Sequence, residues 1–113
     1  NKDHLFYNSL EKSVIFLNVY KATEALDEIL ISLAKRMNFE IIDTLVIKFY
    51  FHCLGMLERA IRKESLDFEV EELEKDDDFR EVKREVGILE RMYGAAISDS
   101  EILYVTKIIK GFL

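Results

Sequence analysis

The chain has 113 residues, which is enough for one domain with a single core and too few for two. Half of the residues are hydrophobic, 34% are charged and none is proline, so a disordered chain and most turn-rich β architectures are excluded and helices are expected. The net charge of −6 argues against nucleic-acid contact by this domain, because such binding depends on clustered Lys and Arg.

The beginning of the chain is the part whose structure is hardest to predict. The apolar run at residues 14–17 is too short for its periodicity to distinguish a strand from a helix. We therefore expect residues 1–20 to be a linker remnant or N-terminal extension, and residues 21–113 to form one helical regulatory domain.

Two helices are predicted in the first half of that domain. Between Ala22 and Met37, apolar residues recur at helical spacing with charged residues between them. After a possible break at Asn38 and Phe39, a more apolar segment predicts a second helix over about residues 40–62.

The next stretch, residues 63–78, is acidic and loses this periodicity, so we expect a long connection with at most one short helix. Apolar residues then return in steps of three and four over residues 79–93, which predicts a third helix. Asp78 and Glu81 are placed to cap its start, and Gly94 is suited to close it in a left-handed conformation.

The last helix has the clearest start signal. Ser98 is followed three residues later by Glu101, as in a capping box, and Ile97 and Ile102 are placed to form a hydrophobic staple. Its predicted apolar face consists of Ile102, Val105, Ile108, Ile109 and Phe112.

Motifs for catalysis, cofactors or metals are not found in the sequence. The four glycines are isolated, so no phosphate-binding loop is predicted, and the acidic cluster at residues 71–78 lacks the spacing and central glycine of a calcium loop. We read that cluster as a solvated loop. His52 and Cys53 are adjacent, so on a helix their side chains diverge and do not form a nucleophilic pair. We expect no enzyme activity and no cofactor.

His52 is the candidate functional residue of the sequence. On a helix it falls at the edge of an apolar face, with Lys48 four residues before it, Gly55 three residues after it and Arg59 seven residues after it. Two cations so placed would stabilise a phosphoryl group on the imidazole through charge-assisted hydrogen bonds. The alternative from spacing alone is a histidine at the boundary of the core that is hydrogen-bonded to backbone.

The segment FHCLGMLER at residues 51–59 resembles the histidine motif of the phosphotransferase-system regulation domain (PRD), in which a helical histidine is followed seven residues later by arginine. Residues 81–93 and 97–104 are similar to the final helix pair of that family. The segment FLN at residues 16–18 resembles the lead-in of the C-terminal PRD in sigma-54-dependent activators of the levanase-regulator type.

The resemblance implies an all-α, compact bundle of about five helices that regulates transcription of sugar operons. It implies phosphorylation of His52 by a phosphotransferase-system phosphocarrier, either the general phosphocarrier or a sugar-specific IIB component, with Arg59 as the electrostatic partner of the phosphate. The helical spacing adds Lys48 as a second phosphate-stabilising cation. The chain departs from the family at Ile108, where many PRDs carry a second histidine seven residues after the acid that matches Glu101. A single phosphorylation site is therefore expected.

A second hypothesis is a structural dimerisation or docking module without phosphorylation. The second predicted helix carries Ile47, Phe51 and Leu54 away from its main apolar face, and these could pack within the domain or against another subunit of a homodimer. A third, a small helical enzyme or ligand carrier, lacks a convergent polar constellation.

The expected compartment is the cytoplasm. Cys53 is the only cysteine, which favours a reducing environment, and no secretory leader or membrane-spanning run is evident. Because the chain begins with Asn1, we expect it to be part of a longer protein.

Overall fold

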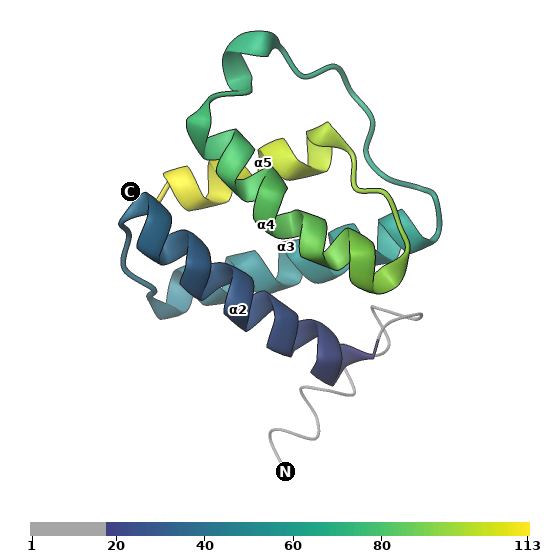
Figure 1. Cartoon of the computed structure of the whole chain (residues 1–113), viewed down its shortest axis with the longest axis horizontal. Coiled ribbons are helices and arrows are strands. Elements are labelled where there is room, and N and C mark those ends of the chain that lie inside the picture. Colours follow the sequence, from purple (N-terminus) through teal and green to yellow (C-terminus); the bar gives the residue numbers. More distant parts are fainter. Residues whose placement is uncertain (1–17) are drawn as a thin grey trace.

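The computed structural model describes residues 18–113, and this part of the chain is helical without strands (Figure 1). It contains the α-helices α2 (Val19–Met37), α3 (Asp43–Ile61), α4 (Asp77–Tyr93) and α5 (Asp99–Lys110), and the single 3₁₀ turn η1 (Glu72–Glu74). The all-α prediction is confirmed, but the described residues hold four α-helices rather than about five.

The connection between α3 and α4 forms no further α-helix, because its apolar side chains are not buried. Within it, Leu66, Phe68 and Leu73 remain exposed, with Leu73 at 93%. A helix in globular proteins is stabilised mainly by burying an apolar face. Because these side chains are not buried, the connection forms only the turn η1 and otherwise runs as an extended loop (Figure 1).

The first described helix begins just before residue 21, where the domain was expected to start. α2 begins at Val19, inside the segment expected to be linker, because Asn18 caps it by accepting a hydrogen bond of 3.1 Å from the Lys21 backbone N–H. The apolar run at residues 14–17, and with it most of the expected linker, lies outside the described residues.

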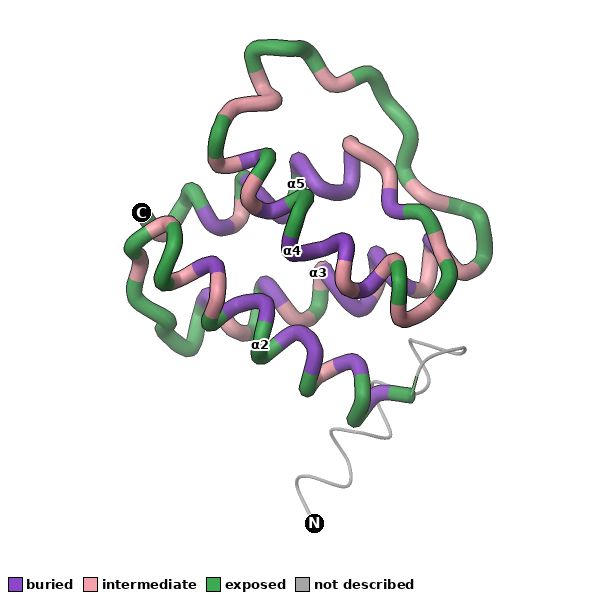
Figure 2. The backbone as a smooth tube through the Cα atoms, in the orientation of Figure 1, coloured by how far each residue is buried: buried purple, intermediate pink, exposed green. Residues whose placement is uncertain are grey.

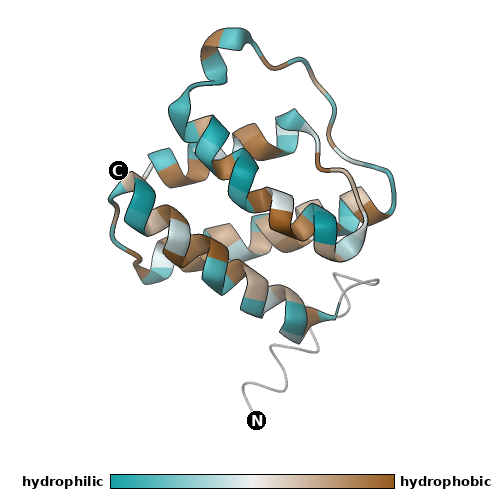
Figure 3. Cartoon of the chain, viewed as in Figure 1, coloured by the Kyte–Doolittle hydropathy of each residue, from teal (hydrophilic) through white to brown (hydrophobic). Residues whose placement is uncertain are grey.

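The four helices enclose one core. α2 packs against α3 and α4, and α5 packs against α3 and α4. The buried residues lie on the inward sides of the helices in Figure 2, and Figure 3 shows hydrophobic residues there and hydrophilic ones outside. The largest fully buried side chains are Leu26, Ile29, Leu33, Leu45, Phe49, Leu54, Met56, Leu57, Phe79, Leu89, Ile102 and Ile109.

Several helix ends follow the sequence signals. Gly94 ends α4 in the left-handed region, with φ 60° and ψ 38°, and Ser98 caps α5 by accepting from the Glu101 backbone N–H at 3.4 Å. The N-cap of α4 is Asp76 instead of Asp78, because the Asp76 side chain accepts from the Phe79 backbone N–H at 2.9 Å. The capping arrangement predicted at Asp78 is thus wrong by two residues.

The three apolar residues on the second face of α3 do not share one environment. Ile47 and Phe51 are 58% and 57% exposed, but Leu54 is buried, with only 1% of its surface exposed. α3 packs against both α2 and α5, so its buried surface is wider than the single stripe that the helical projection assumed. The second apolar face therefore consists of Ile47 and Phe51.

None of the helices between residues 18 and 113 is long and apolar enough to cross a membrane. The same residues contain no cluster of three side chains able to hold a metal ion. Cys53 is a free, buried cysteine.

Candidate functional site

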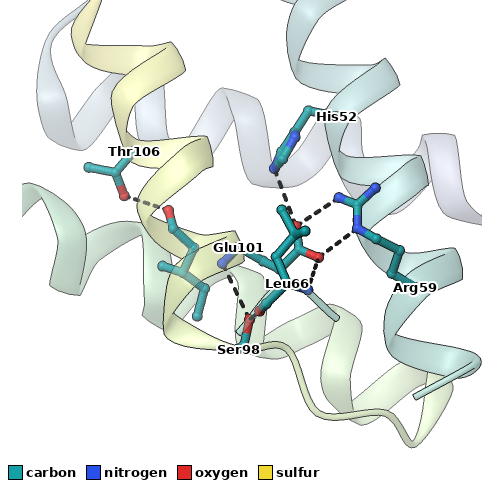
Figure 4. A network of polar contacts seen from close by, with 7 residues as sticks. His52, Arg59, Leu66, Ser98, Glu101 and Thr106 are labelled. Atoms are coloured by element: carbon teal, nitrogen blue, oxygen red, sulfur yellow. Dashed lines mark hydrogen bonds and ion pairs between the residues drawn. The ribbon is translucent and has the colours of Figure 1, made fainter. Parts of the chain in front are cut away.

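His52 lies on α3 and faces α5. Its side chain is 12% exposed, and its ring stacks on that of Tyr104, with centroids 4.6 Å apart and planes inclined by 12°. The Nε2 atom points toward the Glu101 carboxylate, 4.0 Å from Oε1 (Figure 4). The imidazole is thus fixed between an aromatic ring that is itself half exposed and a buried acid.

Glu101 is the centre of the polar network. Its side chain is completely buried, whereas that of Arg59 is 33% exposed. Arg59 donates from Nε to Oε2 at 2.6 Å and from Nη2 to Oε1 at 2.7 Å, which is the two-bond geometry of a strong arginine–carboxylate pair (Figure 4). This pair ties α3 to the first turn of α5.

Gly55 makes room for this arginine. A Cβ atom at position 55 would lie 3.2 Å from Nη1 of Arg59, closer than nearly all real contacts of this kind. The gap that the sequence shows between His52 and Arg59 is therefore occupied by the guanidinium group. Nη1 makes no hydrogen bond with any described residue, so it is the one arginine nitrogen of the site that Glu101 does not use.

The start of α5 also holds the long connection. The Leu66 backbone N–H donates to Glu101 Oε2 at 3.1 Å, and the Ser98 hydroxyl donates to the Leu66 carbonyl at 2.5 Å. The Ser100 side chain accepts from the Phe68 N–H at 2.8 Å and donates to the Phe68 carbonyl at 2.7 Å. The same carboxylate thus serves both Arg59 and the connection.

The electrostatics of the site follow from this arrangement. Burial raises the pKa of Glu101, but the hydrogen bonds from Arg59 and Leu66 and the attraction of Arg59 outweigh it, so the pKa lies below its usual value. The hydrogen bonds to Glu101 raise the pKa of Arg59. Burial lowers the pKa of His52 more than Glu101 raises it. At neutral pH a neutral imidazole therefore faces an ionised acid–arginine pair.

The two ring nitrogens of His52 differ in their surroundings. Nε2 is buried and has no hydrogen-bond partner among the described residues. Nδ1 is not among the buried atoms that lack a partner.

Lys48 does not join this network. Its ammonium group lies over the ring of Phe112, 5.6 Å from the centroid, and it forms no ion pair within residues 18–113. Of the two cations expected around His52, the structure thus brings only Arg59 into the site.

Two residues of the site were not predicted as such from the sequence. Glu101 was read as half of a capping box, but its carboxylate turns inward, so only the Ser98 half of the box forms. Tyr104, three residues later on α5, supplies the stacking surface. The sequence did offer one signal for Glu101. It lies one turn before Val105, at the edge of the predicted apolar face of the last helix, where an acid can turn toward the core.

A comparison with known families gives one match. A family model described as PRD domain matches residues 27–112, which include His52, Arg59, Glu101 and Tyr104. A search of curated proteins and a search of solved structures found no match.

Proposed function

The chain belongs to the PRD family of phosphotransferase-system regulation domains, and from this membership we propose that it is the phosphorylatable regulatory domain of a bacterial transcriptional regulator, with His52 as its phosphoryl acceptor. The family is regulatory rather than catalytic. We further propose that the parent protein is cytoplasmic, acts on sugar metabolism and is a sigma-54-dependent activator of the levanase-regulator type.

The observation that carries the proposal is that a neutral imidazole and a fixed arginine both lie against the buried carboxylate of Glu101. A neutral imidazole has a lone pair on one nitrogen, which is the nucleophile that phosphoryl transfer requires. In the transfer, this nitrogen bonds to phosphorus, the bond from phosphorus to the donor side chain breaks, and its electron pair leaves with the donor. The ring keeps the proton on its other nitrogen.

Arg59 is suited to stabilise the product. Its Nη1 is free while Nε and Nη2 hold Glu101, so the guanidinium could bind a phosphate oxygen without giving up the acid. Lys48 takes a lesser part in this proposal, because its ammonium must first leave the ring of Phe112.

The proposed partners are proteins. The phosphoryl donor is a phosphotransferase-system phosphocarrier, either the general phosphocarrier or a sugar-specific IIB component. A homodimer is the second proposed assembly, because Ile47 and Phe51 are exposed on α3, at 58% and 57%, and Tyr104, which stacks on His52, is 52% exposed on α5. A phosphoryl dianion beside these side chains would change the charge of the surface that the dimer buries.

The test is phosphorylation with phosphoenolpyruvate and the general phosphocarriers. We expect an acid-labile phosphate on the wild type that is lost in His52→Ala and kept in the matched variant His4→Ala, which removes the only other histidine. Labelling that persists in His52→Ala would refute the site. Arg59→Met should reduce the labelled fraction more than Lys48→Met does.

The alternative function is a dimerisation or docking module that is indifferent to His52. The exposure of Ile47 and Phe51 supports it. Sedimentation of the wild type and of His52→Glu distinguishes the two, with circular dichroism to show that both are folded. A module of this kind would show the same mass for both proteins, whereas the phosphorylation proposal expects the mass to change.

A further inference from the structure

The surroundings of the imidazole distinguish its two nitrogens. Nε2 faces the Glu101 carboxylate at 4.0 Å, and it is buried without a hydrogen-bond partner in the described chain. The ring cannot easily turn over, because it stacks on Tyr104 at 4.6 Å. The position of each nitrogen is thus set by contacts on two sides.

The charge of Glu101 selects between the two neutral forms of the ring. A neutral imidazole carries its proton on one nitrogen and a lone pair on the other, and the neighbour of each nitrogen decides which form is present. A lone pair on Nε2 would point at an ionised carboxylate and be repelled, whereas an N–H there is attracted. The favoured form has the proton on Nε2 and leaves the lone pair on Nδ1.

Access favours the same nitrogen. A donor that attached phosphorus to Nε2 would have to place anionic oxygens where a completely buried carboxylate is held by Arg59 and by the Leu66 backbone. Two like charges at such a distance in a buried site repel strongly. Nδ1 is not the nitrogen that faces this carboxylate, and it is not among the buried atoms without a partner.

We propose that His52 accepts the phosphoryl group on Nδ1, and that Glu101 is a positioning residue that sets this choice by holding the proton on Nε2. The inference rests on the proposed function of His52 as acceptor. In the step, the Nδ1 lone pair forms the bond to phosphorus, the bond between phosphorus and the donor breaks with its electrons, and the proton stays on Nε2. The ring then carries a positive charge, which the Glu101 carboxylate stabilises across the 4.0 Å contact.

The first measurement needs no phosphate. In ¹⁵N-labelled His4→Ala protein, His52 is the only histidine, so long-range nitrogen–proton correlations at pH 8 report its protonated nitrogen directly. We expect the signal of the form protonated on Nε2 alone, and a population protonated on Nδ1 in Glu101→Gln. Ser100→Ala is the matched control, because it loosens the same connection without changing the carboxylate. A merely structural role of Glu101 would give Ser100→Ala the same spectrum as Glu101→Gln.

The second measurement locates the phosphate in the same protein, with phosphoramidate as a small-molecule phosphoryl donor. Phosphorus–proton couplings to the ring assign the modified nitrogen, and the protein unfolded in urea shows the product of an unrestrained ring. We expect phosphate on Nδ1 of the folded protein, and a second signal from Nε2 in Glu101→Gln. Phosphate on Nε2 of folded wild type would overturn the inference and leave the proposed acceptor standing. Phosphocarrier labelling that never reaches His52 would overturn the proposed function itself.

Discussion

Arg59 and Glu101 form one ion pair, but the two partners should not contribute equally to stability. Removing one partner of a buried pair is costly because it leaves the other charge uncompensated. The side chain of Glu101 has no exposed surface, whereas that of Arg59 is 33% exposed. Arg59→Met, which keeps most of the aliphatic stem, would strand a carboxylate in the core and should cost about 3–5 kcal/mol of unfolding free energy. Glu101→Gln leaves a guanidinium that can turn toward water and should cost about 1–3 kcal/mol.

The difference should also depend on pH. In the wild type, the pKa of Glu101 lies below its usual value, so the stability it contributes is present above that usual value and is lost as the pH falls through the lowered pKa. In Arg59→Met, burial acts without the arginine and raises the pKa of Glu101 instead. The carboxylate can then take up a proton as the pH falls, so the penalty of Arg59→Met should be larger at pH 7 than at pH 5.

Urea unfolding followed by circular dichroism at 222 nm measures these free energies. Lys83→Met is the matched control, because Lys83 and Asp99 form an exposed pair with side chains 53% and 33% accessible, for which a loss of at most about 1 kcal/mol is expected. The reasoning is refuted if Arg59→Met costs no more than Glu101→Gln and its penalty is the same at both pH values.

Three further predictions concern other parts of the domain. Burial lowers the pKa of His52, so the unfolded chain binds its proton more readily and stability is lost as the pH falls below the usual histidine value. In a His4→Ala background, the urea midpoint should therefore fall less from pH 7.5 to pH 5.5 in His52→Gln than in the protein that keeps His52. Equal falls in the two proteins would contradict this. Gly94→Ala places a side chain at φ 60° and should lower the unfolding free energy by about 1–2 kcal/mol in the same assay. Ser100→Ala removes the acceptor of the Phe68 N–H, so hydrogen exchange of that amide should accelerate while the exchange of core amides in α3 does not.

Local signals in the sequence predicted the helices well. Gly94 and Ser98 ended and started helices as expected, because capping depends on residues within one turn of each other. For Leu54, the sequence left open whether it packs within the domain or against another subunit, and the structure shows that it packs within the domain. Whether that face of α3 is buried depends on where α5 packs, and the sequence of α3 alone does not indicate the position of α5.

The candidate site shows the same division. The spacing of His52 and Arg59 on one helix could be read from the sequence, but the ion pair of Arg59 joins residues 42 positions apart. Glu101 was therefore assigned to a local cap, although its carboxylate accepts hydrogen bonds from Arg59 on α3. Lys48 was placed correctly on α3, but its ammonium group lies over the ring of Phe112. Spacing along one helix does not reveal this contact.

The free nitrogen of Arg59 limits how a phosphate on His52 could act. If the phosphate drew the whole guanidinium away from Glu101, the domain would lose about 3–5 kcal/mol, because the acid would remain buried alone. Reversing a two-state equilibrium from 1:99 to 99:1 requires about 5.5 kcal/mol, so breaking this pair would add a cost of nearly the same size to any such switch. Binding through Nη1 avoids that cost, since Nε and Nη2 can stay on Glu101. Under this proposal the core pair persists, and the effect of phosphorylation is expressed at the exposed side chains of Phe51 and Tyr104.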